Sequence, residues 1–186
     1  MSFVQAIRMP LERVGVLVGK GGSVKSVIEE RCFVTLRIDS PTGEVQVNGR
    51  GDPEKEEVFR AANIVTAIGR GFSPARAYRL LGEDVTLDVV DLKPYAGKSE
   101  AAVARVKGRI IGLNGKARRV IEGLTGADVS VYGRTVGIIG RVDEVRLAKD
   151  AITSLASGSS HSAVYKRLEK ARAAAKVERL KLWEDA

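Results

Sequence analysis

Residues 15–29 read GVLVGKGGSVKSVIE, and residues 108–122 repeat the pattern as GRIIGLNGKARRVIE. Both stretches carry glycines in the spacing G-x3-G-x2-G, and both end in Val-Ile-Glu. A pattern that returns at one fixed distance along a chain indicates two copies of one structural unit. The chain is therefore predicted to be duplicated.

The repeat continues downstream of the glycines as two predicted strands in each copy. Apolar residues alternate with polar ones there, as expected for a half-buried strand. The first strand has Leu36 and Ile38 in one copy and Val129 and Val131 in the other; the second has Val45 and Val47, matched by Val136 and Ile138.

Helices are predicted on both sides of these strands. Apolar periodicity predicts one helix from Asp52 to about Ile68, with Pro53 in its first turn, and its counterpart from Val142 to about Leu155. Residues 160–183 read as one long helix with an apolar stripe inside a basic surface. Upstream of the glycines, each copy opens with an extended segment.

Composition limits the classes of function. The chain has 186 residues, 44% of them hydrophobic, a net charge of +8 and a pI near 9.8, which favours a polyanionic partner. No apolar run is long enough to span a bilayer and the N-terminus has no cleavage signal, so we expect a cytoplasmic protein without membrane partners. One cysteine and one histidine cannot form a disulfide or a zinc site, and no cofactor is expected.

The predicted order is strand, helix, G-x-x-G, helix, strand, strand, helix. This order, with G-x-x-G between two helices, resembles a type I KH domain, present twice. The resemblance implies an α+β fold of two tandem type I KH domains, each a three-stranded antiparallel sheet packed against helices, with extra terminal helices. We expect residues 1–82 to form the first domain with an added helix and residues 83–186 the second with a long C-terminal helix.

The glycine loops are the candidate binding sites. Loop glycines let a phosphodiester backbone approach closely, and the N-terminus of the following helix attracts its charge. KH domains clamp about four nucleotides of single strand in this way. The candidate RNA-binding residues are Gly19, Lys20, Gly21, Gly22 and Lys25 in the first copy, and Arg109, Gly112, Leu113, Asn114, Gly115, Lys116, Arg118 and Arg119 in the second.

Apolar residues beside the loops are the candidate walls of a groove for the bases, although several of them must face the core instead. They are Val16, Leu17, Val27, Ile28 and Leu36 in the first copy, and Ile110, Ile111, Val120, Ile121 and Val129 in the second.

Three other interpretations of the loops compete with RNA binding. A P-loop requires G-x-x-x-x-G-K-[ST]; here three residues separate Gly15 from Gly19, and the second loop lacks the lysine. Nucleotide hydrolysis or transfer is therefore disfavoured, and no catalytic residues are predicted. A KH scaffold that binds only protein stays open, as does a general regulator that binds single-stranded RNA or DNA.

The second copy and its continuation, residues 108–172, are more specific than a KH pattern alone. They are similar to the Dim/Pno group of ribosome-assembly KH proteins, and the compact chain resembles its archaeal form. The resemblance implies binding near the 3′ end of small-subunit rRNA during maturation, alongside the endonuclease that trims that end and other assembly factors, without catalysis by this chain. Leu113 departs from the lysine usual in the group.

Overall fold

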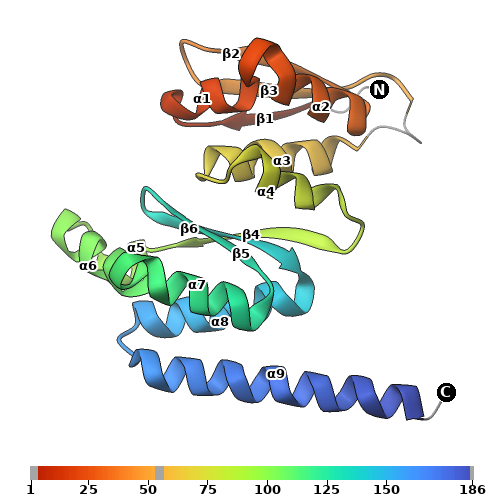
Figure 1. Ribbon diagram of the computed structural model, residues 1–186. Helices are drawn as coiled ribbons and strands as arrows, with labels where there is room; N and C mark the ends of the chain where they lie inside the picture. Colours follow the sequence, from red (N-terminus) through yellow and green to blue (C-terminus); the bar gives the residue numbers. More distant parts are fainter. Residues whose placement is uncertain (1–3, 53–56, 185–186) are drawn as a thin grey trace. The chain divides into compact units, whose positions relative to one another are not determined.

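The structure is a computed structural model that describes residues 4–52 and 57–184. Contacts divide the chain between Leu87 and Asp88 into two units. Each unit holds a sheet of three antiparallel strands with helices packed against it, which confirms the α+β class (Figure 1). The domain boundary expected after residue 82 stays a prediction.

The first unit contains three strands, four α-helices and two short 3-10 helices among its described residues. They are β1 (Val4–Arg8), α1 (Leu11–Val18), η1 (Lys20–Gly22), α2 (Ser23–Arg31), β2 (Val34–Asp39), β3 (Glu44–Gly49), α3 (Val58–Gly69), α4 (Pro74–Ala77) and η2 (Tyr78–Leu81). The strand order across the sheet is β1-β3-β2.

The second unit repeats this order, with an additional short helix after its first strand and a long helix at its end. Its elements are β4 (Val85–Asp91), α5 (Lys93–Ala96), α6 (Glu100–Ile111), η3 (Leu113–Gly115), α7 (Lys116–Thr125), β5 (Asp128–Tyr132), β6 (Thr135–Arg141), α8 (Val142–Ala156) and α9 (His161–Glu184). The strand order, β4-β6-β5, is that of the first sheet. Helix α9 packs against α7 and α8 and is the longest helix in Figure 1.

Equivalent residues of the two copies pair in the same way within the sheets. Leu36 lies opposite Val47 in the first sheet, and Val129 lies opposite Ile138 in the second. All four are at most 1% exposed and pack beneath the helices. The alternation seen in the sequence therefore places one apolar face of each sheet in a core.

In each unit, an arginine of the helix before the glycine loop donates hydrogen bonds to backbone carbonyls much later in the same unit. In the first unit, Arg13 donates from Nε to the Ile68 carbonyl (2.8 Å) and from Nη2 to the Phe72 carbonyl (2.7 Å). In the second, Arg109 donates from Nη2 to the Ser159 carbonyl (2.9 Å). Both contacts join residues at least 50 positions apart.

Some predicted helix ends differ from the observed ones. Helix α8 begins at Val142, as predicted, but α3 begins at Val58 and not at Asp52, so that boundary was wrong. Pro53 lies outside the described residues. Helix α5 was not predicted; the tail helix was. Within residues 4–52 and 57–184, no helix combines the length and apolarity needed to cross a membrane.

Candidate nucleic-acid interface

The two glycine loops have nearly the same backbone. The first glycine, Gly19 or Gly112, has φ 73° and ψ 175° in both. The third position has φ 60° and ψ 25° at Gly21 and φ 51° and ψ 30° at Asn114. Asparagine is among the few residues that accept this left-handed conformation, so Asn114 can replace a glycine without changing the loop.

The first glycine of each loop is required by the structure itself. Its φ and ψ lie in a region that essentially only glycine adopts. A Cβ on Gly19 would lie 2.5 Å from Val24 Cγ2, and a Cβ on Gly112 would lie 2.7 Å from Ala117 Cβ. The close contact lets the chain turn sharply from one helix into the next.

The two residues at the tip of each loop point into solvent. Lys20 and Gly21 are exposed in the first unit, and Leu113 and Asn114 in the second, where Leu113 is 83% exposed. An apolar side chain that is so exposed at a loop tip contributes nothing to the core. It is available to contact a ligand.

The helices that follow the loops start where the sequence predicts. Helix α2 begins at Ser23 and α7 at Lys116, each after a left-handed glycine. No side chain in the described part of the chain caps either N-terminus. The first-turn N–H groups and the positive end of the helix dipole are therefore available to an anion.

A second glycine, one turn before each loop, has no structural explanation. Gly15 in α1 and Gly108 in α6 are exposed, and a Cβ at either position would meet nothing within 4 Å. A glycine inside a helix costs about 1 kcal/mol relative to alanine. Positions that accept this cost without a packing reason are suited to the close approach of a ligand backbone.

The cationic side chains around the two loops differ in their ion-pair partners. Lys116 and Arg119 are exposed and Arg118 is half-buried, and none of the three has an ion-pair partner among the described residues. In the first unit, Lys25 lies 3.8 Å from the Glu29 carboxylate. The second loop therefore has the stronger unpaired positive charge.

Arg109 is the candidate residue with a structural contact of its own. Its guanidinium is half-buried and donates to the Ser159 carbonyl, while its own carbonyl lies 2.7 Å from His161 Nε2. Arg109 thus ties α6 to the start of α9. No sequence pattern signals this contact, because the residues are 50 and 52 positions apart.

The candidate groove walls separate into core residues and half-buried residues. Those that remain half-buried beside the loops are Val16 and Val27 in the first unit and Ile111 and Val120 in the second. The others form the core and are at most 1% exposed: Leu17, Ile28, Leu36, Ile110, Ile121 and Val129. Two apolar side chains in each unit therefore remain to meet a base.

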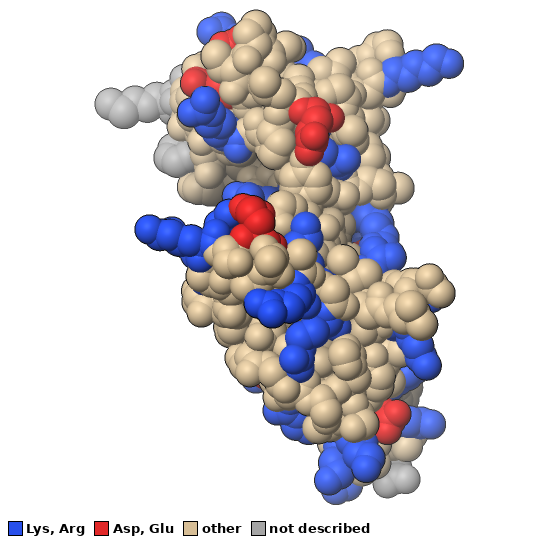
Figure 2. Space-filling model, turned by 90° about the vertical axis from the view of Figure 1, so that its left-hand side faces the viewer, with Lys and Arg blue, Asp and Glu red and all other residues tan. Residues whose placement is uncertain are grey.

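The surface charge agrees with an anionic partner. On the face drawn in Figure 2, lysine and arginine side chains outnumber aspartate and glutamate side chains. Among the residues that the structure describes, no group of three histidine, cysteine or acidic side chains is placed to hold a metal ion. Cys32 is fully buried, and this burial raises the pKa of its thiol to about 11.

A family model identifies the second unit. Residues 86–173 match the model of a eukaryotic type KH domain (KH domain type I), built for the second KH domain of PNO1. The strand order and the G-x-x-G loop described above are those of this class. The second unit is therefore a type I KH domain.

Relatives that match most of the chain identify its family. The chain is 46% identical over 182 residues to a KH domain-containing protein of Methanocaldococcus jannaschii, covering 97% of this chain and 79% of the relative. It is 27% identical over 149 residues to the pre-rRNA-processing protein pno1 of Schizosaccharomyces pombe, covering 79% and 62%.

A solved structure matches in fold as well as in sequence. It is a chain of the a/eIF2α–Dim2p–rRNA complex from Pyrococcus horikoshii, with a TM-score of 0.85, 44% identity and coverage of 92% of this chain and 94% of that chain. The chain belongs to the Dim2/PNO1 family of KH-domain proteins. The family resemblance seen in the sequence is confirmed.

Proposed function

We propose that this chain is a non-catalytic protein that binds single-stranded RNA in small-subunit ribosome assembly. The RNA contacted is the 3′ region of the small-subunit rRNA, and the loop at residues 112–115 is its main clamp. Relatives named for pre-rRNA processing and a similar chain in an rRNA complex support this assignment. The cytoplasmic location expected from the sequence stays a prediction.

One observation carries the proposal: the open, exposed backbone at Gly108, one helical turn before a loop with unpaired cations. Nothing in the fold needs glycine there, and a phosphodiester backbone could approach without meeting a Cβ. The first-turn N–H groups of α7 and the charges of Lys116, Arg118 and Arg119 would then neutralise its phosphates. Ile111 and Val120 would contact the bases.

We assign a different role to the first unit. Its topology and loop backbone are those of the second unit, so we propose that it too is a type I KH domain. Its candidate residues include two cations, Lys20 and Lys25, against four in the second unit, and Lys25 lies 3.8 Å from the Glu29 carboxylate. We propose that this unit contributes weakly to RNA binding and is the docking surface for the rRNA-maturation endonuclease or other assembly factors.

Fluorescence anisotropy with labelled RNA tests the function. The probe is a single strand matching the 3′ end of small-subunit rRNA, compared with a scrambled RNA and with DNA of the same sequence. The variant Leu113→Asp/Asn114→Asp places two carboxylates at the exposed tip of the second loop. Lys20→Asp/Gly21→Asp is the matched control in the first loop.

We expect the second-loop variant to lose at least about tenfold in affinity, or about 1.4 kcal/mol, and the first-loop variant to lose less. The affinity of the unmodified chain should fall by about 0.7 log units per phosphate contact for each tenfold rise in salt. Equal affinity for scrambled RNA or DNA would favour a general regulator. Unchanged affinity in both variants would show that the loops do not bind RNA.

A further inference from the structure

The second half of helix α9 lies outside the core of its unit. Val164 and Leu168 are buried and hold the first half against α7 and α8. From Arg172 to Trp183, every side chain is exposed. A helix rises 1.5 Å per residue, so about 18 Å of it presents its surface to solvent.

This exposed half has one face of cations that ends in an aromatic ring. Arg172, Lys176, Arg179 and Trp183 follow one another at spacings of four, three and four residues. Residues at these spacings lie on the same face of a helix. We call this face the α9 stripe; Trp183, its last residue, is 83% exposed.

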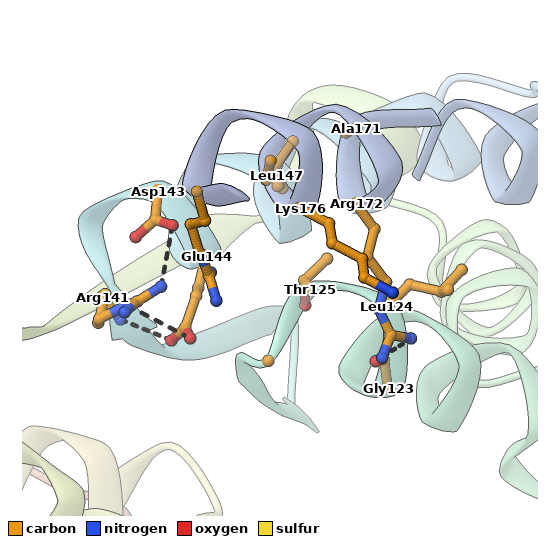
Figure 3. A pocket seen from close by; sticks show the side chains of 13 residues that line it. Gly123, Leu124, Thr125, Arg141, Asp143, Glu144, Leu147, Ala171, Arg172 and Lys176 are labelled. Carbon is orange, nitrogen blue, oxygen red and sulfur yellow. Dashed lines mark hydrogen bonds and ion pairs between the residues drawn. The ribbon is translucent and has the colours of Figure 1, made fainter. Parts of the chain in front are cut away.

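A line of exposed residues on α7 joins the stripe to the second glycine loop. Lys116, Arg119 and Gly123 are exposed and follow at spacings of three and four, which places them on one face of α7. Arg172 donates from Nη1 to the Gly123 carbonyl (3.4 Å), so the stripe begins where the α7 line ends (Figure 3). Lys116, Arg119 and the cations of the stripe therefore follow one another from the loop to α9.

A hollow lies beneath the stripe, and the carboxylates that line it are paired with an arginine. The hollow has a volume of about 460 Å³ and lies between α7, α8 and α9. Its two carboxylates both meet Arg141: Asp143 Oδ2 lies 3.2 Å from Nη2, and Glu144 Oε1 lies 3.5 Å from Nε (Figure 3). Arg172, Lys176 and Arg179 supply the rest of its charge.

We propose that the α9 stripe binds the sugar–phosphate backbone of single-stranded RNA that flanks the nucleotides clamped at the second loop, and that Trp183 stacks on one of its bases. Cations that follow a backbone, with an aromatic ring for a base, are the usual elements of single-strand binding. The inference rests on the proposed function. It extends the RNA contact well beyond the four nucleotides that a KH clamp holds.

The length of RNA needed follows from the two helices. Helix α7 has 10 residues and the stripe covers 12, which together give a path of about 33 Å. A stacked strand advances about 3.4 Å per nucleotide, so about ten flanking nucleotides reach Trp183. The test therefore compares a four-nucleotide RNA with one that carries about ten further nucleotides on each side.

The variant Arg172→Glu/Lys176→Glu/Arg179→Glu reverses the charge of the three cations of the stripe. Its matched control, Lys166→Glu/Lys170→Glu/Lys181→Glu, makes the same change in net charge on the opposite side of the same helix, and all six residues are exposed. We expect the stripe variant to lose at least about tenfold in affinity for the long RNA and the control much less. The slope of log affinity against log salt should fall by about 2 in the stripe variant, because three phosphate contacts are lost.

Trp183 is the only tryptophan of the chain, so tryptophan fluorescence, excited selectively over that of the four tyrosines, reports on this position alone. The long RNA should quench it and the four-nucleotide RNA should not. Equal losses of RNA affinity in both triple variants, or unquenched Trp183 fluorescence, would overturn the proposal that the α9 stripe binds RNA. If the Leu113→Asp/Asn114→Asp variant still weakens binding in that case, the proposed function stands; if the unmodified chain binds no RNA, both fail.

Discussion

The two glycine loops share one backbone and differ in their side chains. Gly19 and Gly112 have the same φ and ψ, and the helices after them start at equivalent positions. The side chains at the tips are Lys20 and Gly21 in one unit and Leu113 and Asn114 in the other. The residues that set the loop geometry are thus different from the tip residues that we propose to contact RNA.

A second shared feature supports this separation. Glu29 accepts a hydrogen bond from the Leu36 N–H (2.7 Å), and Glu122 accepts one from the Val129 N–H (2.8 Å). Each carboxylate ties the helix after a loop to the next strand at the same distance along the chain. The last residue of Val-Ile-Glu therefore belongs to the scaffold, and the comparison between the units concerns surface side chains.

The largest expected effect comes from the first glycine of each loop. Gly112→Ala would place a Cβ 2.7 Å from Ala117 and force alanine into a glycine-only conformation. We expect a loss of at least about 3 kcal/mol in the stability of the second unit, from strain and overlap together. Hydrogen exchange of peptides from each unit measures this loss separately for the two units.

Gly19→Ala is the matched change, because its Cβ would lie 2.5 Å from Val24 Cγ2. It should destabilise the first unit by a similar amount and leave the second unit protected. A large difference between the two losses would contradict the view that both loops are set by the same backbone requirement.

The next prediction compares alanine substitutions at two glycines, one inside α7 and one directly after it. Gly126 ends α7 with φ 84°, and a Cβ there would lie 2.7 Å from Glu144 Oε1. Gly126→Ala should cost about 2 kcal/mol from the left-handed conformation and this contact. Gly123→Ala, where a Cβ meets nothing, should instead stabilise α7 by about 1 kcal/mol. Hydrogen exchange of α7 distinguishes the two signs; destabilisation by both would contradict the prediction.

The first unit shows that the left-handed turn itself can be kept without glycine. Phe33 stands where the second unit has Gly126, and it has φ 53°. Arg50 lies over the Phe33 ring, with Cζ 5.6 Å from the ring centre. A cation–π contact of this kind offsets part of the strain of the left-handed conformation. The alanine of Gly126→Ala has no ring and would gain no such contact.

The helix glycines should separate stability from RNA affinity. Gly108→Ala and Gly15→Ala both fill open space inside a helix, so each should stabilise its unit by about 1 kcal/mol. Only Gly108→Ala should weaken RNA binding, by several-fold, because its Cβ would lie where we propose that the RNA backbone approaches. Anisotropy and hydrogen exchange on the same samples test this. Unchanged RNA affinity in Gly108→Ala would remove the main support for the proposed clamp.

Much of this fold could be predicted from local patterns. The glycine spacing fixed the loop positions and the starts of α2 and α7, and the alternation of Leu36 with Ile38 and of Val45 with Val47 identified two strands. These patterns suffice because they reflect backbone conformation and the period of a strand, which are local properties.

The remaining features depend on contacts between distant residues. Leu17 and Ile28 have the same character as Val16 and Val27, and only packing shows that the first two form the core. The contacts of Arg13 with Ile68 and of Arg109 with Ser159 span 55 and 50 positions. The contact of Arg172 with Gly123, which joins the α9 stripe to α7, spans 49 positions and was likewise not predicted from the sequence.

The smallest expected effect concerns one buried position that the two units fill differently. Cys32 corresponds to Thr125, whose Oγ1 donates to the Ile121 carbonyl (2.8 Å) one turn earlier. In Cys32→Thr, the new hydroxyl would have the Ile28 carbonyl at the equivalent place, where the Cys32 N–H already donates (3.0 Å). At pH 7 we therefore expect a change below about 1 kcal/mol, measured by urea denaturation.

The stabilities of Cys32→Thr and of the unmodified chain should differ clearly only in alkaline solution. Burial raises the pKa of the Cys32 thiol to about 11 in the folded state, whereas an unfolded cysteine has a pKa near 8.5. Above about pH 8.5 the unfolded chain loses the proton and the folded chain keeps it, so the stability that Cys32 contributes is lost as pH rises toward 11. Since Cys32→Thr has no thiol to titrate, its stability should fall less steeply between about pH 8.5 and 11 than that of the unmodified chain. Parallel curves would mean that Cys32 ionises as easily in the folded unit as in the unfolded chain.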